Sequence, residues 1–155
     1  MDSAYFEVRK QKALEIYAKQ RTIFSPYFNL DIVLNSNGFH HLQFSARSER
    51  PKEAQLLKFT LLPLGLDIIK KTTTLQESRK LLSPVGKKSK GDGLRATKLV
   101  EWWGFIAIFV EQDIKVKVVL RRVGSGNITF WSVMPYTKFR KDRTQKLFTD
   151  GIEDE

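Results

Sequence analysis

The C-terminal third of the chain constrains the fold most, because it holds three consecutive segments with the pattern of β-strands. The segments are Leu99–Val110, Ile114–Val123 and Ile128–Met134. The first is rich in aromatic and β-branched residues, and the second alternates apolar and polar residues, as a strand with one buried face does. Glu111-Gln112-Asp113 has the composition of a turn, and Gly124-Ser125-Gly126-Asn127 is a strong hairpin signal. Short connections join antiparallel neighbours, so we predict a three-stranded antiparallel meander.

The N-terminal part of the chain predicts one helix and one strand. Residues 4–24 have apolar positions three and four residues apart, which indicates a helix that Ser25-Pro26 ends. Phe28–Leu34 begins by alternating apolar and polar residues and stops at the turn cluster 35–38. We therefore predict a strand there.

The middle of the chain predicts further helix. The spacing is helical over 52–71, where Pro63 and Gly65 are expected to kink or split the helix. Residues 72–84 begin with a capping-box spacing and end at a proline, which predicts a second helical piece. The glycines and lysines of 86–93 predict a flexible basic loop.

This order of elements predicts an α+β fold: an N-terminal helix, one strand, a helical insert, and then the three-stranded antiparallel meander as a small sheet. One face of the sheet is expected to pack on the helices, and the other to be free for a site. Because the chain has no internal repeat and no long linker, we expect residues 1–150 to form a single domain, followed by an acidic tail at 151–155.

The composition excludes several classes of protein. Hydrophobic residues make up 41% of the chain, which is enough to bury a core. No cysteine is present, so disulfides, thiolate zinc sites and a cysteine nucleophile are excluded. The N-terminus lacks the pattern of a signal peptide, and the most apolar stretch, Leu61–Leu66, is shorter than a membrane span, which needs about 20 residues. We therefore expect a soluble, cytoplasmic protein without a membrane partner.

The charge of the chain indicates a polyanionic partner. The formal net charge is +10, and the segment from Lys115 to Lys146 contains nine basic residues against one acid, Asp142. Clustered positive charge is typical of nucleic-acid binding. One alternative is a protein with an ordinary basic surface. Binding to an anionic membrane is less well supported, because no single long helix pairs a basic face with an apolar one.

The second predicted strand places basic side chains on one face. By the two-residue period, Lys115, Lys117 and Arg121 share a face that is suited to phosphate contacts, although ordinary solvated alternation is the alternative. The length of the following hairpin loop decides what joins them. A two-residue loop adds Ser132 to that face, and a three-residue loop adds Thr129 instead.

His40 and His41 are the only histidines and lie just after the turn cluster. Because histidine titrates near neutral pH, the pair is suited to general acid–base catalysis on a 2′-hydroxyl. The alternative is a partly buried or surface pair without a function. Trp102, Trp103 and Trp131 are candidates for base stacking, but at least two of them are expected to be buried.

No metal or cofactor is expected. Two adjacent histidines without cysteine do not form a zinc ligand set, and no paired-aspartate pattern indicates a two-metal nuclease. The chain also lacks a phosphate-binding loop and a dinucleotide-binding glycine motif.

Taken in order, these segments resemble a known group of nucleases. The Phe-His-His-Leu segment at 39–42 precedes a helical insert, and the aromatic strand Trp102–Ala107 follows it. Lys115–Arg121 and then Gly126–Val133 close the series. This order is similar to that of phage- or mobile-element-borne members of the barnase–EndoU–colicin–RelE-like nucleases, and the resemblance covers Phe28–Pro135. The order of the elements matches better than any single motif does.

The resemblance implies a small, metal-independent ribonuclease, often a toxin. A toxin in turn implies an acidic antitoxin or immunity protein as partner. A glutamate base of the barnase kind is not evident on the strands. The roles that the resemblance implies are general acid or base for His41 or His40, phosphate binding and charge stabilisation for Lys117 and Arg121, and positioning of the scissile phosphate for Ser132 or Thr129.

We therefore predict a metal-independent endoribonuclease that binds and cleaves RNA. The alternative is a non-catalytic nucleic-acid-binding module, a regulator or accessory protein, which needs only the basic and aromatic residues. A third hypothesis is a protein-interaction or inhibitor module that meets an acidic partner. The further residues expected to contact nucleic acid are Lys115, Arg47, Thr129, Lys138 and Arg140.

Overall fold

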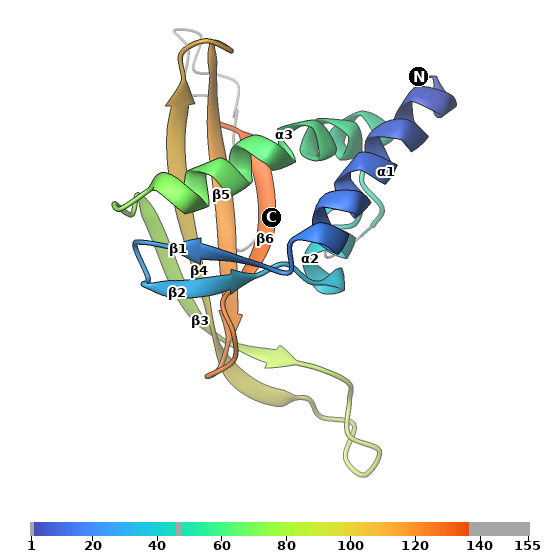
Figure 1. The fold of residues 1–155 in the computed structure, drawn as a ribbon. Coiled ribbons are helices and arrows are strands. Elements are labelled where there is room, and N and C mark those ends of the chain that lie inside the picture. The colour runs from blue at the N-terminus through green and yellow to red at the C-terminus, as the bar shows by residue number, and fades with distance from the viewer. Residues whose placement is uncertain (1, 46–47, 137–155) are drawn as a thin grey trace, which may run out of the picture.

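The computed structural model describes residues 2–45 and 48–136 and has an α+β fold (Figure 1). Its helices and strands are, in chain order, α1 (Ser3–Lys19), β1 (Thr22–Ser25), β2 (Leu30–Val33), α2 (Ser36–Gln43), α3 (Lys52–Lys71), β3 (Glu77–Val85), β4 (Ala96–Phe109), β5 (Ile114–Val123) and β6 (Thr129–Pro135). Among the described residues, no helix is long and apolar enough to cross a membrane.

The sheet has six strands in the order β1-β2-β6-β5-β4-β3. The predicted antiparallel meander is confirmed as β4, β5 and β6, but it is only part of a larger mixed sheet. β3 extends the sheet beyond β4. On the other side the β1–β2 hairpin joins β6 through one parallel pair, Val33 with Thr129.

The predicted second helical piece at 72–84 is wrong, because Glu77–Val85 is the strand β3. β4 is 14 residues long, and its outer backbone groups need hydrogen-bond partners. β3 supplies them over the register from Glu77 opposite Gly104 to Val85 opposite Ala96. Pro84 is compatible with this strand because β3 lies at the edge of the sheet.

Other parts of the structure also differ from the sequence prediction. The first helix ends at Lys19, and residues 22–25 form β1 instead of its last turn. The turn cluster 35–38 begins the helix α2, in which the Asn35 side chain accepts a hydrogen bond from the Gly38 N–H at 3.0 Å. The helix α3 continues through Pro63 without being split.

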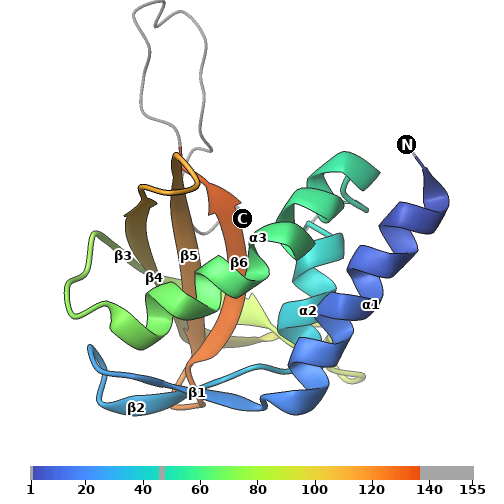
Figure 2. The same ribbon diagram turned by 45° about the horizontal axis from the view of Figure 1, so that its top comes forward.

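One face of the sheet packs on the helices. Figure 2 shows α3 crossing the central strands, with α1 beside it and α2 next to β6. Gly65 of α3 lies against Val133 of β6, where the absence of a side chain lets helix and strand approach closely. Aromatic contacts join the helices, since the Phe59 ring lies 5.8 Å from both the Phe6 and Phe39 rings.

The opposite face of the sheet is not free, contrary to the prediction. Val100, Trp102 and Val119 are buried there in a second apolar cluster, with Trp131 and Met134 packed against them. The expectation that at least two tryptophans are buried is confirmed, because Trp102 and the helix-facing Trp103 are buried. A site on this face would therefore have to share it with packed apolar side chains.

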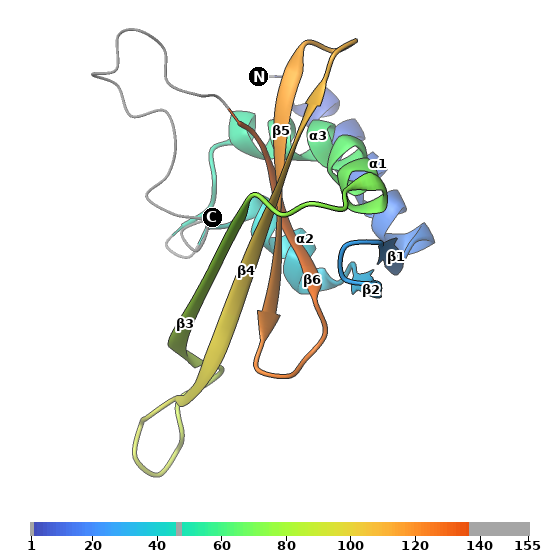
Figure 3. The same cartoon turned by 90° about the vertical axis from the view of Figure 1, so that its left-hand side faces the viewer.

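The β3–β4 hairpin extends beyond the rest of the sheet. Pairing between β4 and β5 stops at Val100 opposite Val123, whereas β3 and β4 remain paired as far as Val85 and Ala96. Residues 82–99 are therefore a two-stranded ribbon with its connecting loop, and we call them the arm. Figures 1 and 3 show the arm projecting away from the helices and the other strands.

We predict that Gly38→Ala destabilises the protein although Gly38 lies in a helix. Alanine usually stabilises a helix by about 1 kcal/mol relative to glycine. Here an added Cβ would overlap the backbone carbonyl oxygen of Phe130, so we expect the free energy of unfolding to fall by about 1–3 kcal/mol. Denaturant unfolding measures this. The exposed neighbour Asn37→Ala is the matched control and should not destabilise. Equal stability of both variants would show that α2 does not pack on β6 this closely.

Candidate nucleic-acid interface

The basic face predicted on β5 is present, but Lys117 is not on the surface. It is 5% exposed, and its Nζ lies 3.3 Å from Oε2 of Glu77 on β3. Gly104 on the intervening strand leaves room for this contact, since an added Cβ would lie within 3.6 Å of both side chains. Both Lys117 and Lys115 lie over the Tyr136 ring, at 5.5 and 5.3 Å. Lys117 is thus a buried, paired cation.

Arg121 lies among aromatic rings. Its guanidinium carbon is 4.3 Å from the Trp131 ring centre and 5.8 Å from that of Trp102. A planar guanidinium stacks well on such rings. Burial lowers the pKa of Arg121, because desolvation disfavours the charged form. The contacts of Arg121 therefore join β5 to the apolar cluster of this face.

His41 reaches the same indole ring from α2. Its ring is stacked 4.4 Å from that of Trp131, so the structure brings His41 and Arg121 together. The Arg50 Nη2 lies 3.2 Å from the His41 Nε2, and the Arg50 Nε donates to the His41 carbonyl at 3.1 Å. Because a guanidinium has only donors, Nε2 must accept. The lone pair that a general base would use is therefore hydrogen-bonded to a cation.

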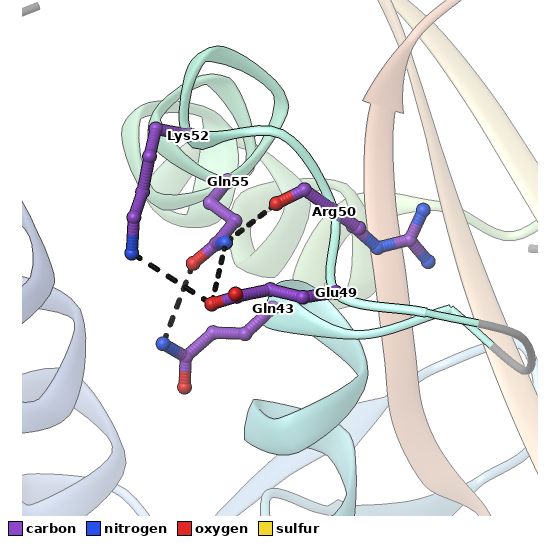
Figure 4. Close-up of polar contacts among 5 residues, drawn as sticks. All are labelled: Gln43, Glu49, Arg50, Lys52 and Gln55. Atoms are coloured by element: carbon purple, nitrogen blue, oxygen red, sulfur yellow. Dashed lines mark hydrogen bonds and ion pairs between the residues drawn. The ribbon is translucent and has the colours of Figure 1, made fainter.

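A polar network holds Arg50 in this position (Figure 4). The fully buried Gln55 donates from Nε2 to the Arg50 carbonyl at 2.7 Å, and its Oε1 accepts from Gln43 at 3.4 Å. Glu49 contacts both Gln55 and Lys52 in the same network. The Arg50 side chain points away from these groups in Figure 4. The position of Arg50 against His41 is thus set by the junction between α2 and α3.

His40 lies elsewhere. It is exposed and stacked on Phe44 at 4.4 Å, and it lines a cavity of about 420 Å³ that Tyr17 also lines. Burial raises the pKa of Tyr17, so its phenol stays neutral. Adjacent residues on a helix point in different directions, which is why His40 and His41 do not share one site.

Ser132 is fully buried and acts as a hydrogen-bond acceptor. The amino group of Lys58, on α3, donates to its Oγ at 2.8 Å and to the Val133 carbonyl at 3.1 Å.

The pairing of β5 with β6 combines the two registers that the sequence left open, one with Ser132 on the basic face and one with Thr129 there. A β-bulge between Val119 and Leu120 changes the register within the ladder. Thr129 lies opposite Arg121 before the bulge, and Ser132 lies opposite Val119 after it. Both residues therefore share the face that the basic ladder occupies.

Three predicted contact residues lie outside the described residues: Arg47, Lys138 and Arg140. The same holds for the predicted acidic tail at 151–155. Within residues 2–45 and 48–136, no three histidine, aspartate or glutamate side chains are placed to hold a metal ion.

The arm carries a group of exposed cations that we did not predict to contact nucleic acid. The loop was predicted from its glycines and lysines, but its residues were not included among the candidate contacts. Two left-handed glycines, Gly86 and Gly93, turn the chain at either end of the loop. The one acid, Asp92, accepts a hydrogen bond from the Leu94 N–H at 2.9 Å. The exposed cations of the arm are Lys87, Lys88, Lys90, Arg95 and Lys98.

Comparisons with known proteins add no relative. No protein-family model matches the chain, and no curated protein and no solved structure matches it. The nuclease resemblance therefore stays a prediction.

We predict that Glu77→Gln destabilises the protein because it leaves the buried Lys117 cation without its counter-ion. The expected loss is about 1–3 kcal/mol, less than for a fully buried pair, since the Glu77 side chain is 32% exposed. Adding Lys117→Met should restore part of the loss. The exposed Lys71–Asp67 pair is the control, and Asp67→Asn should cost about 0.5 kcal/mol or less. If Glu77→Gln is as mild as Asp67→Asn in denaturant unfolding, Lys117 does not depend on Glu77.

Proposed function

We propose that the protein binds nucleic acid through the arm and does not cleave it. The observation that supports this is the concentration of exposed cations on a ribbon that projects into solvent. Residues 82–99 contain five basic residues and one acid, and all of residues 86–99 are exposed. A phosphate backbone can approach such a ribbon from several sides, because no other strand of the described residues covers it.

Electrostatics favours this use of the arm. Lysine and arginine that neutralise phosphates release condensed counter-ions, which supplies most of the sequence-independent affinity for nucleic acid. The Asp92 carboxylate is engaged with a backbone N–H of the loop, so it helps to shape the tip. The net positive charge of the whole chain, +10, adds long-range attraction to the same partner.

The contacts of the predicted catalytic residues support binding over catalysis. His41 is bonded to the Arg50 guanidinium, Lys117 is paired with Glu77, and Ser132 is buried under Lys58. Cleavage would require at least the Arg50 contact to open, since Nε2 is the nitrogen that it occupies. Metal-independent ribonuclease activity stays the competing prediction, and the meeting of His41 and Arg121 on Trp131 is the observation in its favour.

Neutralising the arm tests the binding proposal. We expect a variant without the charges of the arm to bind a fluorescent oligonucleotide more weakly. A plot of the logarithm of its association constant against the logarithm of the salt concentration should also have a shallower slope, by about 0.7–0.9 for each phosphate that the arm no longer neutralises. The control removes the same charge from α1 and the residues that follow it. Fluorescence anisotropy across a salt series measures both. The arm variant replaces Lys87, Lys88, Lys90, Arg95 and Lys98 by Gln, and the control variant replaces Arg9, Lys10, Lys12, Lys19 and Arg21 by Gln.

Equal losses of affinity in the two variants would mean that net charge alone drives binding, and the arm would have no special part. Cleavage of RNA by the wild type in EDTA, abolished by His40→Ala/His41→Ala, would instead establish the ribonuclease. We expect intact RNA in that assay, and unchanged nucleic-acid affinity in the double histidine variant.

A further inference from the structure

The shape and composition of the arm indicate which form of nucleic acid it fits. Two paired strands lie about 5 Å apart, so a ribbon with its side chains has a width close to that of the B-form major groove, about 12 Å. Beyond Val100, no strand of the described residues 2–45 and 48–136 pairs with the arm as a third strand, so both of its long edges are open to the part of the chain that the structure describes. It is thus narrow enough to enter a groove rather than lie across one.

The cations of the arm lie on both sides of the hairpin. Lys87, Lys88 and Lys90 follow β3, whereas Arg95 precedes β4 and Lys98 lies within it. A ribbon in a groove has one phosphate backbone on each side, so cations on both sides of the hairpin suit that arrangement. A flat basic surface that lies across the nucleic acid would not need cations on both sides of the hairpin.

The arm also exposes apolar side chains. Leu82 is 74% exposed and Leu94 is 67% exposed, and Leu82 lies directly opposite the exposed Leu99 in the β-ladder. Leaving such leucines in water is unfavourable, and burying them on a partner regains that free energy. In the major groove, the thymine methyl group is the apolar feature that such side chains can contact.

The arm lacks the feature that single-stranded nucleic acid needs. Residues 82–99 contain no aromatic residue, whereas single-strand binding depends on aromatic rings that stack on successive bases. Two of the three tryptophans, Trp102 and Trp103, are buried in the body of the sheet. Double-stranded RNA fits no better, because its A-form major groove is too deep and narrow for a ribbon.

We propose that the arm docks in the major groove of double-stranded DNA, with its cations on the flanking phosphates and its leucines on the groove floor. This inference depends on the proposed nucleic-acid binding and names its substrate class. It differs from the RNA substrate that we predicted from the sequence, because that prediction was based on metal-independent cleavage.

Competition binding with the full chain tests the inference. The probes are one short sequence prepared as a DNA duplex, as an RNA duplex and as single strands, at one salt concentration. We expect the DNA duplex to bind about tenfold more tightly than either other form. A minor-groove-binding polyamide should leave this affinity unchanged, and bulky glucosyl groups on the cytosines of the major groove should abolish the preference.

A leucine variant separates groove contacts from charge. Leu82→Ser/Leu94→Ser keeps every cation, so its salt dependence should match that of the wild type while its preference for the DNA duplex falls severalfold. Thermal unfolding checks that both proteins fold alike. The matched control is Ile108→Ser/Val110→Ser, which changes two exposed apolar residues, one near the far end of β4 and one in the turn just after it, and this control should keep the preference.

The outcomes separate the two proposals. Equal or tighter binding of the RNA duplex or of single strands would overturn the groove inference and leave nucleic-acid binding in place. Retention of the preference in the leucine variant would also overturn it. If the wild type binds none of the three probes in a salt-dependent way, the proposed function itself fails.

Discussion

The described fold depends on the length of β4 and on the need to pair its backbone along both edges. β4 has 14 residues, and β5 has 10 and pairs only with its far part. Where β5 pairs with it, β4 contributes Trp103 and Phe105 to the main core. Where β5 ends, β4 continues with β3 alone as the arm. One continuous strand thus connects the candidate interface to the most buried part of the protein.

The polar residues that the sequence assigned to a catalytic site stabilise packing in the structure. A buried charge or hydroxyl is costly unless it is paired, and three pairs meet that requirement around β5 and β6. Glu77 neutralises Lys117, Lys58 bonds Ser132, and Arg50 bonds the ring of His41. This grouping also explains why basic and histidine residues gather near β6 as members of hydrogen-bonded and ion-paired contacts.

Local sequence signals predicted the elements that are determined locally. The bounds of β5 were predicted to the residue, because its alternation and its flanking turns lie within a short stretch. β3 was missed because its conformation depends on β4, which lies further along the chain, and not on its own propensity. The α2 helix was missed because eight residues with a turn-like start resemble a loop until Asn35 is seen as a cap.

The candidate site was also predictable only where a local sequence pattern determines it. The alternation placed Lys115, Lys117 and Arg121 on one face, but the burial of Lys117 depends on Glu77, forty residues away. The side on which Thr129 and Ser132 lie depends on a bulge that no local pattern reveals. The basic loop at 86–93 was visible in the sequence. Its position at the end of a projecting ribbon followed only from the strand β3.

Hydrogen–deuterium exchange of the full chain, with and without a short DNA duplex, shows directly which residues the duplex contacts. The exposed backbone of the arm should exchange rapidly in the free protein, since open hairpin ends are among the least protected parts of a fold. We predict that the duplex protects residues 82–99 and leaves 39–43 and 129–134 unchanged. Protection centred on His41 and Trp131 with none in the arm would contradict binding through the arm and would instead place the site on the face of β5 and β6.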